Sequence, residues 1–343
     1  MNDERSIIPK VGVIGTGALG KVHSRIYSEL ASSHKVNFIG VYDINRLLAQ
    51  KIADTYKVKI FNSLDEAAQE CDAMSIVTPT VTHYEIAMQL LRNRRHIFVE
   101  KPMTDSTNKA VEMVQLAREN GCVLQVGHIE RFNPVYSFLQ NNVKNPRFIE
   151  AHRLSPFPER STDIGVVLDL MIHDLDVVIA FVNSEIESFD AVGISVLSKS
   201  EDIANVRIRF KNGCIANLTA SRISPEKMRK IRVFSGGEAP CYVSLDYRAQ
   251  EGFLYKLASK DETESSFLKK VLTSKTETIV SQFAGKKIVR EPVPIEKDEP
   301  LKLELLHFIE CVKAKQNPIV SGEVALQSLE LALEITKNIH EHH

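Results

Sequence analysis

At about 150 residues per domain, the 343-residue chain is long enough for two domains, and both can bury cores without disulfides or structural metals. Its 43 basic and 44 acidic side chains leave a formal charge of −1, which excludes the strongly basic surface that nucleic-acid binding requires. A hydrophobic fraction of 43% with 25% charged residues is typical of a globular protein and excludes disordered, collagen-like and coiled-coil chains.

The cysteines and the apolar segments indicate the compartment. The five cysteines are odd in number and none has the C-x-x-C spacing of a zinc or redox site, so we expect reduced thiols in a cytoplasmic protein. The N-terminus is charged and lacks the apolar core of a signal peptide. Charged or polar side chains interrupt the longest apolar stretch, Ile164–Val182, which therefore does not have the pattern of a membrane span.

Strands and helices alternate over the first third of the chain. Short apolar runs predict strands at Val11–Ile14, Val36–Tyr42, Ala73–Val77, His96–Val99 and Val123–Val126. Helical patterns separate them, at Leu19–Leu30, Arg46–Tyr56, Glu85–Leu91 and Ser106–Glu119. This alternation predicts a Rossmann-type domain over residues 1–134, a doubly wound parallel sheet with its functional loops at the carboxyl ends of the strands.

The pattern changes in the rest of the chain, residues 135–343. Runs at 147–153, 187–197, 202–210, 214–221, 229–235 and 240–247 predict a mostly antiparallel open sheet in an α+β domain. We expect one helix, Gly165–Val182, against this sheet and two closing helices, Glu299–Lys315 and Glu323–His340, with room to pack back on the first domain. The polar segment Ser259–Lys287 shows no clear pattern, and we assign it no function.

A glycine-rich turn follows the first predicted strand and opens the first helix. Its sequence is Gly15-Thr16-Gly17-Ala18-Leu19-Gly20, and Asp43 ends the second strand. The glycines permit a tight turn, close approach to a pyrophosphate and close helix packing, while the helix N-terminus attracts the anion. A carboxylate at position 43 accepts hydrogen bonds from ribose hydroxyls and repels a 2′-phosphate, which favours NAD over NADP. The alternative is a structural turn in which Asp43 caps the next helix.

The loop after the Ala73–Val77 strand is a second candidate for cofactor contact. Thr78 stands in this loop and His83 begins the helix that follows. In a doubly wound sheet such a loop lies over the cofactor. Loop rigidity from Pro79 and an N-cap from Thr82 explain the same residues structurally.

A lysine follows the strand His96–Val99, in the run Glu100-Lys101-Pro102. Its position at the carboxyl end of a strand faces the crevice in which open α/β sheets bind ligands. A partly desolvated ammonium at that point polarises a substrate hydroxyl or stabilises an alkoxide. The alternative is a surface lysine beside a proline that turns the chain.

Three polar side chains form one stripe on the predicted helix Gly165–Val182. Asp169, His173 and Asp176 are spaced i, i+4, i+7 among apolar neighbours. Asp169, one turn before His173, is placed to fix the imidazole tautomer and raise its basicity. A structural Asp–His pair is the alternative. We predict no metal, because no third element supplies a clear ligand.

Taken together, these motifs resemble those of the Gfo/Idh/MocA family of NAD(P)-dependent sugar oxidoreductases over essentially the full length of the chain. The resemblance also covers the tail Asn317–Gly322, which leads into the last helix. It implies that Lys101 and His173 act on a substrate hydroxyl, that Asp169 supports them, and that Glu100 belongs with the cofactor-binding residues. It further implies a homodimer or homotetramer formed through the C-terminal sheet.

Two further stretches, 127–134 and 153–157, resemble the branch that contains UDP-N-acetylglucosamine 3-dehydrogenases, which work with an aminotransferase to make 3-amino sugars. Arg131 and Arg153 are candidates for bidentate contact with a substrate diphosphate, although either also fits an ordinary interface or salt-bridge role. We therefore expect NAD-dependent oxidation of a secondary hydroxyl of a nucleotide sugar, such as C3 of UDP-N-acetylglucosamine. The alternatives are a dehydrogenase of a free polyol, inositol or small carbonyl compound, and a non-catalytic NAD-binding regulator.

Overall fold

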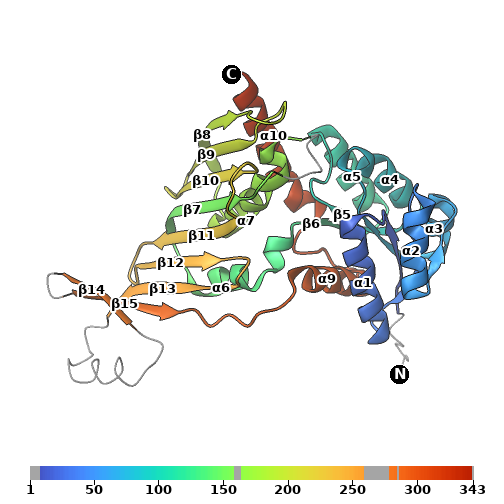
Figure 1. Cartoon of the computed structure of the whole chain (residues 1–343), viewed down its shortest axis with the longest axis horizontal. Coiled ribbons are helices and arrows are strands. Elements are labelled where there is room, and N and C mark those ends of the chain that lie inside the picture. Colours follow the sequence, from blue (N-terminus) through green and yellow to red (C-terminus); the bar gives the residue numbers. More distant parts are fainter. Residues whose placement is uncertain (1–7, 158–163, 259–277, 284–285, 342–343) are drawn as a thin grey trace. The chain divides into compact units, whose positions relative to one another are not determined.

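The computed structural model describes residues 8–157, 164–258, 278–283 and 286–341. They form two compact units (Figure 1). The first holds the chain up to Phe132 together with Glu299–Leu331, and the second holds Asn133–Asp298 together with the chain from Ala332 onward. Residues 259–277 and 284–285 of the polar segment without an assigned function lie outside the described residues, as do the two terminal histidines.

The first unit contains a six-stranded sheet in the order β3-β2-β1-β4-β5-β6, with every pair parallel. The strands are β1 (Lys10–Ile14), β2 (Asn37–Tyr42), β3 (Lys59–Ile60), β4 (Ala73–Ile76), β5 (His96–Glu100) and β6 (Leu124–Gly127). The order reverses between β1 and β4. Open α/β sheets bind ligands at such a switch point, beyond the carboxyl ends of the strands.

Helices connect the parallel strands of this unit, as Figure 1 shows. They are α1 (Ala18–Ser32), α2 (Arg46–Tyr56), α3 (Leu64–Glu70), α4 (Thr80–Arg92) and α5 (Thr107–Glu119). The 3₁₀ turn η1 (Ile129–Phe132) follows β6, and α9 (Pro300–Ala314) joins this unit from the C-terminal part of the chain. The helix α10 (Gly322–Glu341) begins in this unit and ends in the second.

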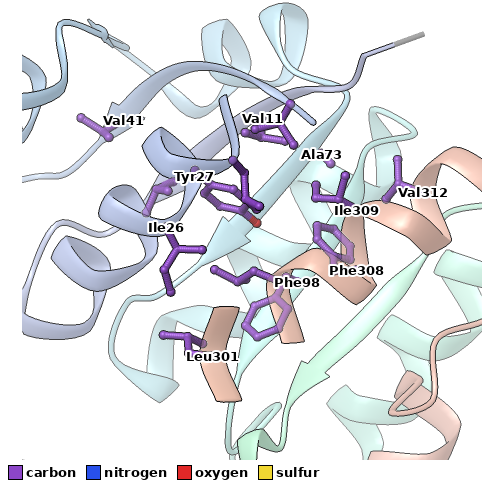
Figure 2. Packing of buried hydrophobic residues seen from close by; sticks show 14 of the residues in the cluster. Val11, Ile26, Tyr27, Val41, Ala73, Phe98, Leu301, Phe308, Ile309 and Val312 are labelled. Carbon is purple, nitrogen blue, oxygen red and sulfur yellow. The ribbon is translucent and has the colours of Figure 1, made fainter. Parts of the chain in front are cut away.

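The core of the first unit joins α1 and α9 to the sheet (Figure 2). Ile26 and Tyr27 of α1 and Phe308 of α9 are fully buried beside Phe98 of β5. The Phe98 and Phe308 rings meet edge to face with their centroids 5.9 Å apart. Full burial of each such side chain contributes about 1.5–3 kcal/mol, so α9 is an integral part of this core.

The second unit contains a nine-stranded sheet in the order β14-β15-β13-β12-β11-β7-β10-β9-β8. Its strands are β7 (Pro146–Leu154), β8 (Ile186–Ile194), β9 (Ile203–Phe210), β10 (Ile215–Ser221), β11 (Met228–Ser235), β12 (Cys241–Asp246), β13 (Glu251–Leu257), β14 (Thr278–Phe283) and β15 (Lys286–Pro292). All pairs are antiparallel except β7 with β10, which are parallel.

Helices cover one face of this sheet. They include α6 (Pro134–Asn142), the π-helical turn η2 (Val167–Met171) and α7 (Ile172–Val182), and α7 packs on β7 and β10. Ile339 of α10 lies against Gly193 of β8. Alternate residues of β9 point toward these helices, since Val206, Ile208 and Phe210 are at most 1% exposed. Buried and more exposed side chains therefore alternate along this strand.

The predicted fold class, a doubly wound parallel sheet followed by a mostly antiparallel sheet, is confirmed. The sequence patterns missed β3, β13, β14 and β15, and they predicted a regular helix where the segment after Gly165 opens with a π turn. No helix in the described part of the chain has the length and apolar character to cross a membrane.

Candidate active site

The glycine turn between β1 and α1 combines two tightly packed positions with one open position. Gly15 has φ +94°, and a Cβ there would lie 2.5 Å from the Val77 carbonyl oxygen. A Cβ on Gly20 would lie 2.0 Å from the Gly15 carbonyl oxygen, whereas one on Gly17 would meet nothing within 4 Å. Gly17 is also the N-cap of α1 and provides no side-chain cap. The turn therefore presents open space and an uncapped helix N-terminus, which suits a pyrophosphate.

Asp43 lies beside this turn, just past the end of β2. The Thr16 backbone N–H and hydroxyl donate to its Oδ2 at 2.7 and 2.8 Å, and the Asn45 backbone N–H donates to its Oδ1 at 2.7 Å. Because a carboxylate has about four acceptor positions, Asp43 retains capacity for a ribose hydroxyl. The carboxylate thus braces the turn, a role that the sequence analysis did not predict, and its geometry fits the predicted cofactor role.

The loop after β4 is tied to the loop after β5 through His83. His83 is 1% exposed, with Nε2 2.9 Å from the Thr78 carbonyl oxygen and Nδ1 3.0 Å from the Pro102 carbonyl oxygen. Burial lowers the pKa of His83, which favours the neutral imidazole. The Thr82 hydroxyl donates to the Thr78 hydroxyl at 2.7 Å. His83 therefore lies between the two loops, and the neutral ring donates to one of the two carbonyl oxygens, depending on its tautomer.

Glu100 ends β5 in a buried contact that sequence reasoning missed. His23 of α1 is fully buried, and its Nε2 lies 3.0 Å from Glu100 Oε1. A Cβ on Gly127 would lie 2.9 Å from Glu100 Oε2, so the neighbouring strand leaves room only for the carboxylate. One signal was present, because His23 lies on the same face of α1 as the buried Ile26 and Tyr27.

Lys101 stands directly after this anchored glutamate, at the carboxyl end of β5. It is half-buried and joined to Pro102 by a cis peptide bond. This is the edge of a parallel sheet at which ligands bind. An ammonium held here by β5 is placed to stabilise negative charge on a substrate oxygen.

The second unit carries the other predicted catalytic residues. Asp169 lies in the π turn η2 and His173 in the first turn of α7, and both are half-buried. Asp176, the third member of the predicted stripe, is 2% exposed. Asp169 and His173 therefore come from one continuous helical segment, whereas Lys101 belongs to the first unit.

The two candidate arginines differ in their surroundings. Arg153 of β7 is 3% exposed, and its Nε and Nη2 donate to the Asp174 carboxylate of α7 at 2.8 and 2.9 Å. This bidentate pair fastens α7 to the sheet, the salt-bridge role that the sequence analysis had left open for Arg153. Arg131 lies half-buried in η1 of the first unit. Contact of either residue with a diphosphate stays a prediction.

The chain matches two family models. Residues 9–128 match the model described as "Oxidoreductase family, NAD-binding Rossmann fold", and residues 139–237 match the "GFO/IDH/MocA C-terminal domain". It is also 38% identical over 239 residues to UDP-N-acetylglucosamine 3-dehydrogenase of Acidithiobacillus ferrooxidans, which covers 69% of this chain and 74% of that protein. The chain belongs to the Gfo/Idh/MocA family.

Two further similarities extend over nearly the whole of this chain. A solved structure of the Acidithiobacillus ferrooxidans enzyme matches with a TM-score of 0.84 and 31% identity, covering 97% of this chain and 98% of that one. The scyllo-inositol 2-dehydrogenase (NAD(+)) of Bacillus subtilis is 25% identical over 348 residues, 96% of this chain and 93% of that protein. As a Gfo/Idh/MocA protein, the chain is an NAD-binding oxidoreductase with a Rossmann domain that acts on CH–OH groups.

Among the described residues, no group of three or more His, Cys, Asp and Glu side chains is arranged to hold a metal ion. The residues that fit a cofactor are those of the glycine turn and Asp43. NAD, when bound there, supplies the acceptor for a hydride.

Proposed function

We propose that this protein oxidises a secondary hydroxyl of a nucleotide sugar, with C3 of UDP-N-acetylglucosamine as the first substrate to test. The observation that carries the proposal is the similarity to the Acidithiobacillus ferrooxidans enzyme, whose name specifies this substrate and position. The presence of Lys101, Asp169 and His173 supports catalysis over a purely regulatory role.

In the proposed reaction, His173 removes the proton from the substrate hydroxyl while Lys101 stabilises the negative charge that develops on the oxygen. The carbon–oxygen double bond forms as the C–H bond breaks with its electron pair, and NAD held by the glycine turn and Asp43 would accept the hydride. Asp169 holds the imidazole of His173 in the orientation and tautomer that accept a proton. These residues supply orientation and electrostatic stabilisation.

To test the proposal, the protein is mixed with NAD and each of a panel of UDP-sugars, and formation of NADH is measured by its absorbance. An aminotransferase and an amino donor are added to remove the keto sugar and draw the reaction forward. We expect Lys101→Ala and His173→Ala each to lower turnover by about 10²-fold or more. Lys109→Ala is the matched control, because Lys109 pairs with Asp105 on the exposed surface of α5. Near-wild-type turnover by His173→Ala on the true substrate would refute the assignment.

A second candidate is oxidation of a free cyclitol. The similarity to the Bacillus subtilis scyllo-inositol dehydrogenase, which extends over almost the whole chain, favours it. The same assay distinguishes the two, because turnover of inositols without turnover of any UDP-sugar would select the cyclitol.

We further propose a cytoplasmic homo-oligomer formed through the sheet face of the second unit that lies opposite α7. A row of aromatic rings crosses four strands of this face, with ring centroids 5.6 Å apart for Phe148–Phe234, 4.5 Å for Phe234–Tyr242 and 5.0 Å for Tyr242–Tyr255. A hollow of about 460 Å³ lies over part of this row, and Phe234 is 38% exposed beside it. Exposed aromatic area of this kind favours association. Analytical ultracentrifugation of Phe234→Glu is expected to show smaller particles than the wild type.

A further inference from the structure

The segment that carries Asp169 and His173 is held at its start by groups from distant parts of the second unit. The Val166 backbone N–H donates to the Glu201 carbonyl oxygen at 2.9 Å, and the Val167 backbone N–H donates to Glu201 Oε1 at 3.2 Å. Glu201 lies just before β9 and is 1% exposed. Because the first N–H groups of a helix have no partner within it, Glu201 satisfies two of them from outside.

Arg222 holds the same segment from the end of β10. Its Nη1 donates to the Ile164 carbonyl oxygen at 2.7 Å, and its Nε donates to Asp202 Oδ1 at 2.9 Å. The Arg222 and Asp202 side chains are both fully buried. Glu201, Asp202 and Arg222, which we call the clamp, thus fix three consecutive peptide groups ahead of Asp169.

Asp202 is itself anchored by the backbone. Its Oδ2 accepts hydrogen bonds from the Val196, Leu197 and Ser198 backbone N–H groups at 2.8, 2.6 and 3.0 Å. The loop after β8 therefore fixes Asp202, and Asp202 in turn fixes Arg222. The Ser198 hydroxyl donates to Oδ1 at 2.7 Å, so both carboxylate oxygens keep a donor if the guanidinium is removed.

Gly165 shows how closely Glu201 approaches the helical segment. A Cβ on Gly165 would lie 1.9 Å from Glu201 Oε1, so any other residue displaces the carboxylate. The Gly165 carbonyl oxygen accepts the Asp169 backbone N–H at 3.0 Å. Gly165 therefore lies against the clamp and is also hydrogen-bonded to the backbone of Asp169.

The turn that follows is π-helical over Val167–Met171, wider than an α-helical turn. The placement of Asp169 relative to His173 therefore depends on where the first turn is fixed. We propose that Glu201 and Arg222 are positioning residues, which set the geometry of the Asp169–His173 pair by fixing the first turn of this segment. The inference rests on the proposed function, because it gives both residues a part in hydroxyl oxidation.

The first experiment compares Glu201→Ala with Glu201→Gln in steady-state kinetics on the substrate found in the panel. Glu201→Ala is expected to lower kcat by about 10- to 100-fold, the scale of a small misplacement of catalytic groups, with little change in KM. Glu201→Gln keeps an oxygen for the Val167 N–H and is expected to recover most of the loss. Glu185→Ala is the control, since Glu185 forms an exposed ion pair with Lys211 and should change neither constant.

The pH profile separates positioning from a general loss of structure. A carboxylate beside an imidazole favours its protonated form, so displacement of Asp169 should move the acid limb of the kcat profile to lower pH. Within the clamp, Arg222 Nε donates to Asp202 Oδ1, and from outside it the titratable His340 of α10 places Nε2 3.3 Å from Glu201 Oε2. His340→Asn is therefore measured in parallel and should retain the wild-type profile.

Hydrogen–deuterium exchange over 164–173 in the full chain without substrate gives a readout independent of activity. Glu201→Ala, Arg222→Met and Gly165→Ala should speed exchange there, while Arg209→Met, which removes only an exposed partner of Asp190, should not. Wild-type kcat and pH profile in Glu201→Ala overturn the inference. So does a kcat loss that Glu201→Gln shares and that follows a lowered Tm in both variants. If the wild type oxidises neither sugars nor cyclitols, the proposed function fails, whatever the exchange shows.

Discussion

The two units hold their ligand-facing segments by different physical means. In the first unit, backbone contacts at Gly15 and Gly20, hydrogen bonds to the Asp43 carboxylate and a buried imidazole, His83, fix the loops at the carboxyl edge of the sheet. In the second unit, buried ion pairs hold the helical segment: Arg153 pairs with Asp174 of α7, and Arg222, paired with Asp202, donates to the Ile164 carbonyl oxygen at its start.

The difference follows from what each segment presents. A turn that receives a pyrophosphate needs free N–H groups and space, so glycine packing is suitable and a side-chain carboxylate cap at the helix N-terminus would compete with the anion. A helix that presents an acid–base pair needs one fixed geometry. Buried ion pairs stabilise a fold little, yet they are costly to break, so they hold such a geometry firmly.

The largest effect is expected from Asp174→Asn, which tests whether the buried Arg153–Asp174 pair holds α7. This change removes the charge that two Arg153 donors share in a buried site, and we expect it to lower the free energy of unfolding by about 3–5 kcal/mol. Urea unfolding measures the change. In the control Asp190→Asn, which breaks an exposed pair with Arg209, the loss should stay below about 1 kcal/mol. Equal losses in the two variants would show that the buried Arg153–Asp174 pair is no costlier to break than an exposed pair of the same unit.

In the first unit, two glycine substitutions distinguish the tightly packed position of the turn from the open one. Gly15→Ala places a Cβ against the Val77 carbonyl in a left-handed backbone, and we expect a stability loss of about 1–3 kcal/mol. Gly17→Ala meets no protein atom and should leave Tm nearly unchanged, while NAD affinity falls about tenfold because the methyl group takes the open space. Isothermal titration with NAD checks the second effect. A large Tm loss in Gly17→Ala, or full NAD affinity, would show that the open space does not receive the cofactor.

The smallest expected effect is a difference in pH response. Burial lowers the pKa of His83, and of His96 and His307 in the same unit. The unfolded chain then binds protons more readily, so stability is intact above the ordinary histidine pKa of about 6.5 and falls as the pH drops below it. Scanning calorimetry should show this decline, and His83→Asn should make it shallower. An identical slope in the variant would contradict the assignment.

The pKa of Asp202 in the second unit is also lowered, and its effect on stability has the same direction but begins at lower pH. Burial raises the pKa of its carboxyl, but backbone hydrogen bonds from Leu197 and its neighbours outweigh that effect and hold the pKa well below its usual range. Its contribution to stability is therefore complete above the ordinary aspartate pKa of about 3.9 and is lost only as the pH falls further.

Whether the sequence predicted a feature of this arrangement depends on how far apart in the chain the contacting residues are. The glycine turn, the strand before Lys101 and the helix of His173 follow local patterns, and the structure contains all three elements. The bridge from His83 to Pro102 and the pairing of Arg153 with Asp174 join residues 19 and 21 positions apart, which no periodicity reveals. The catalytic and binding roles of the named residues stay predictions.

The clamp and the π turn were beyond the reach of sequence reasoning for a related reason. Glu201 and Arg222 appear in the sequence as ordinary charged residues, 34 and 58 positions from the groups they bind. Only the folded sheet brings the start of β9 and the end of β10 to the beginning of the helical segment. Gly165 was the only local signal of this close contact, and the sequence pattern indicated only that a helix starts there.

The burial of α9 in the core of the first unit means that this unit is discontinuous in the chain. Phe308 and Leu305 lie against residues synthesised some two hundred positions earlier, and the intervening chain builds a separate sheet. A ribosome therefore releases most of the second unit before the first can complete its interior. A fragment ending near Phe132 would lack one wall of its own core, so an isolated NAD-binding domain has to be made by joining Glu299–Leu331 to it through a linker.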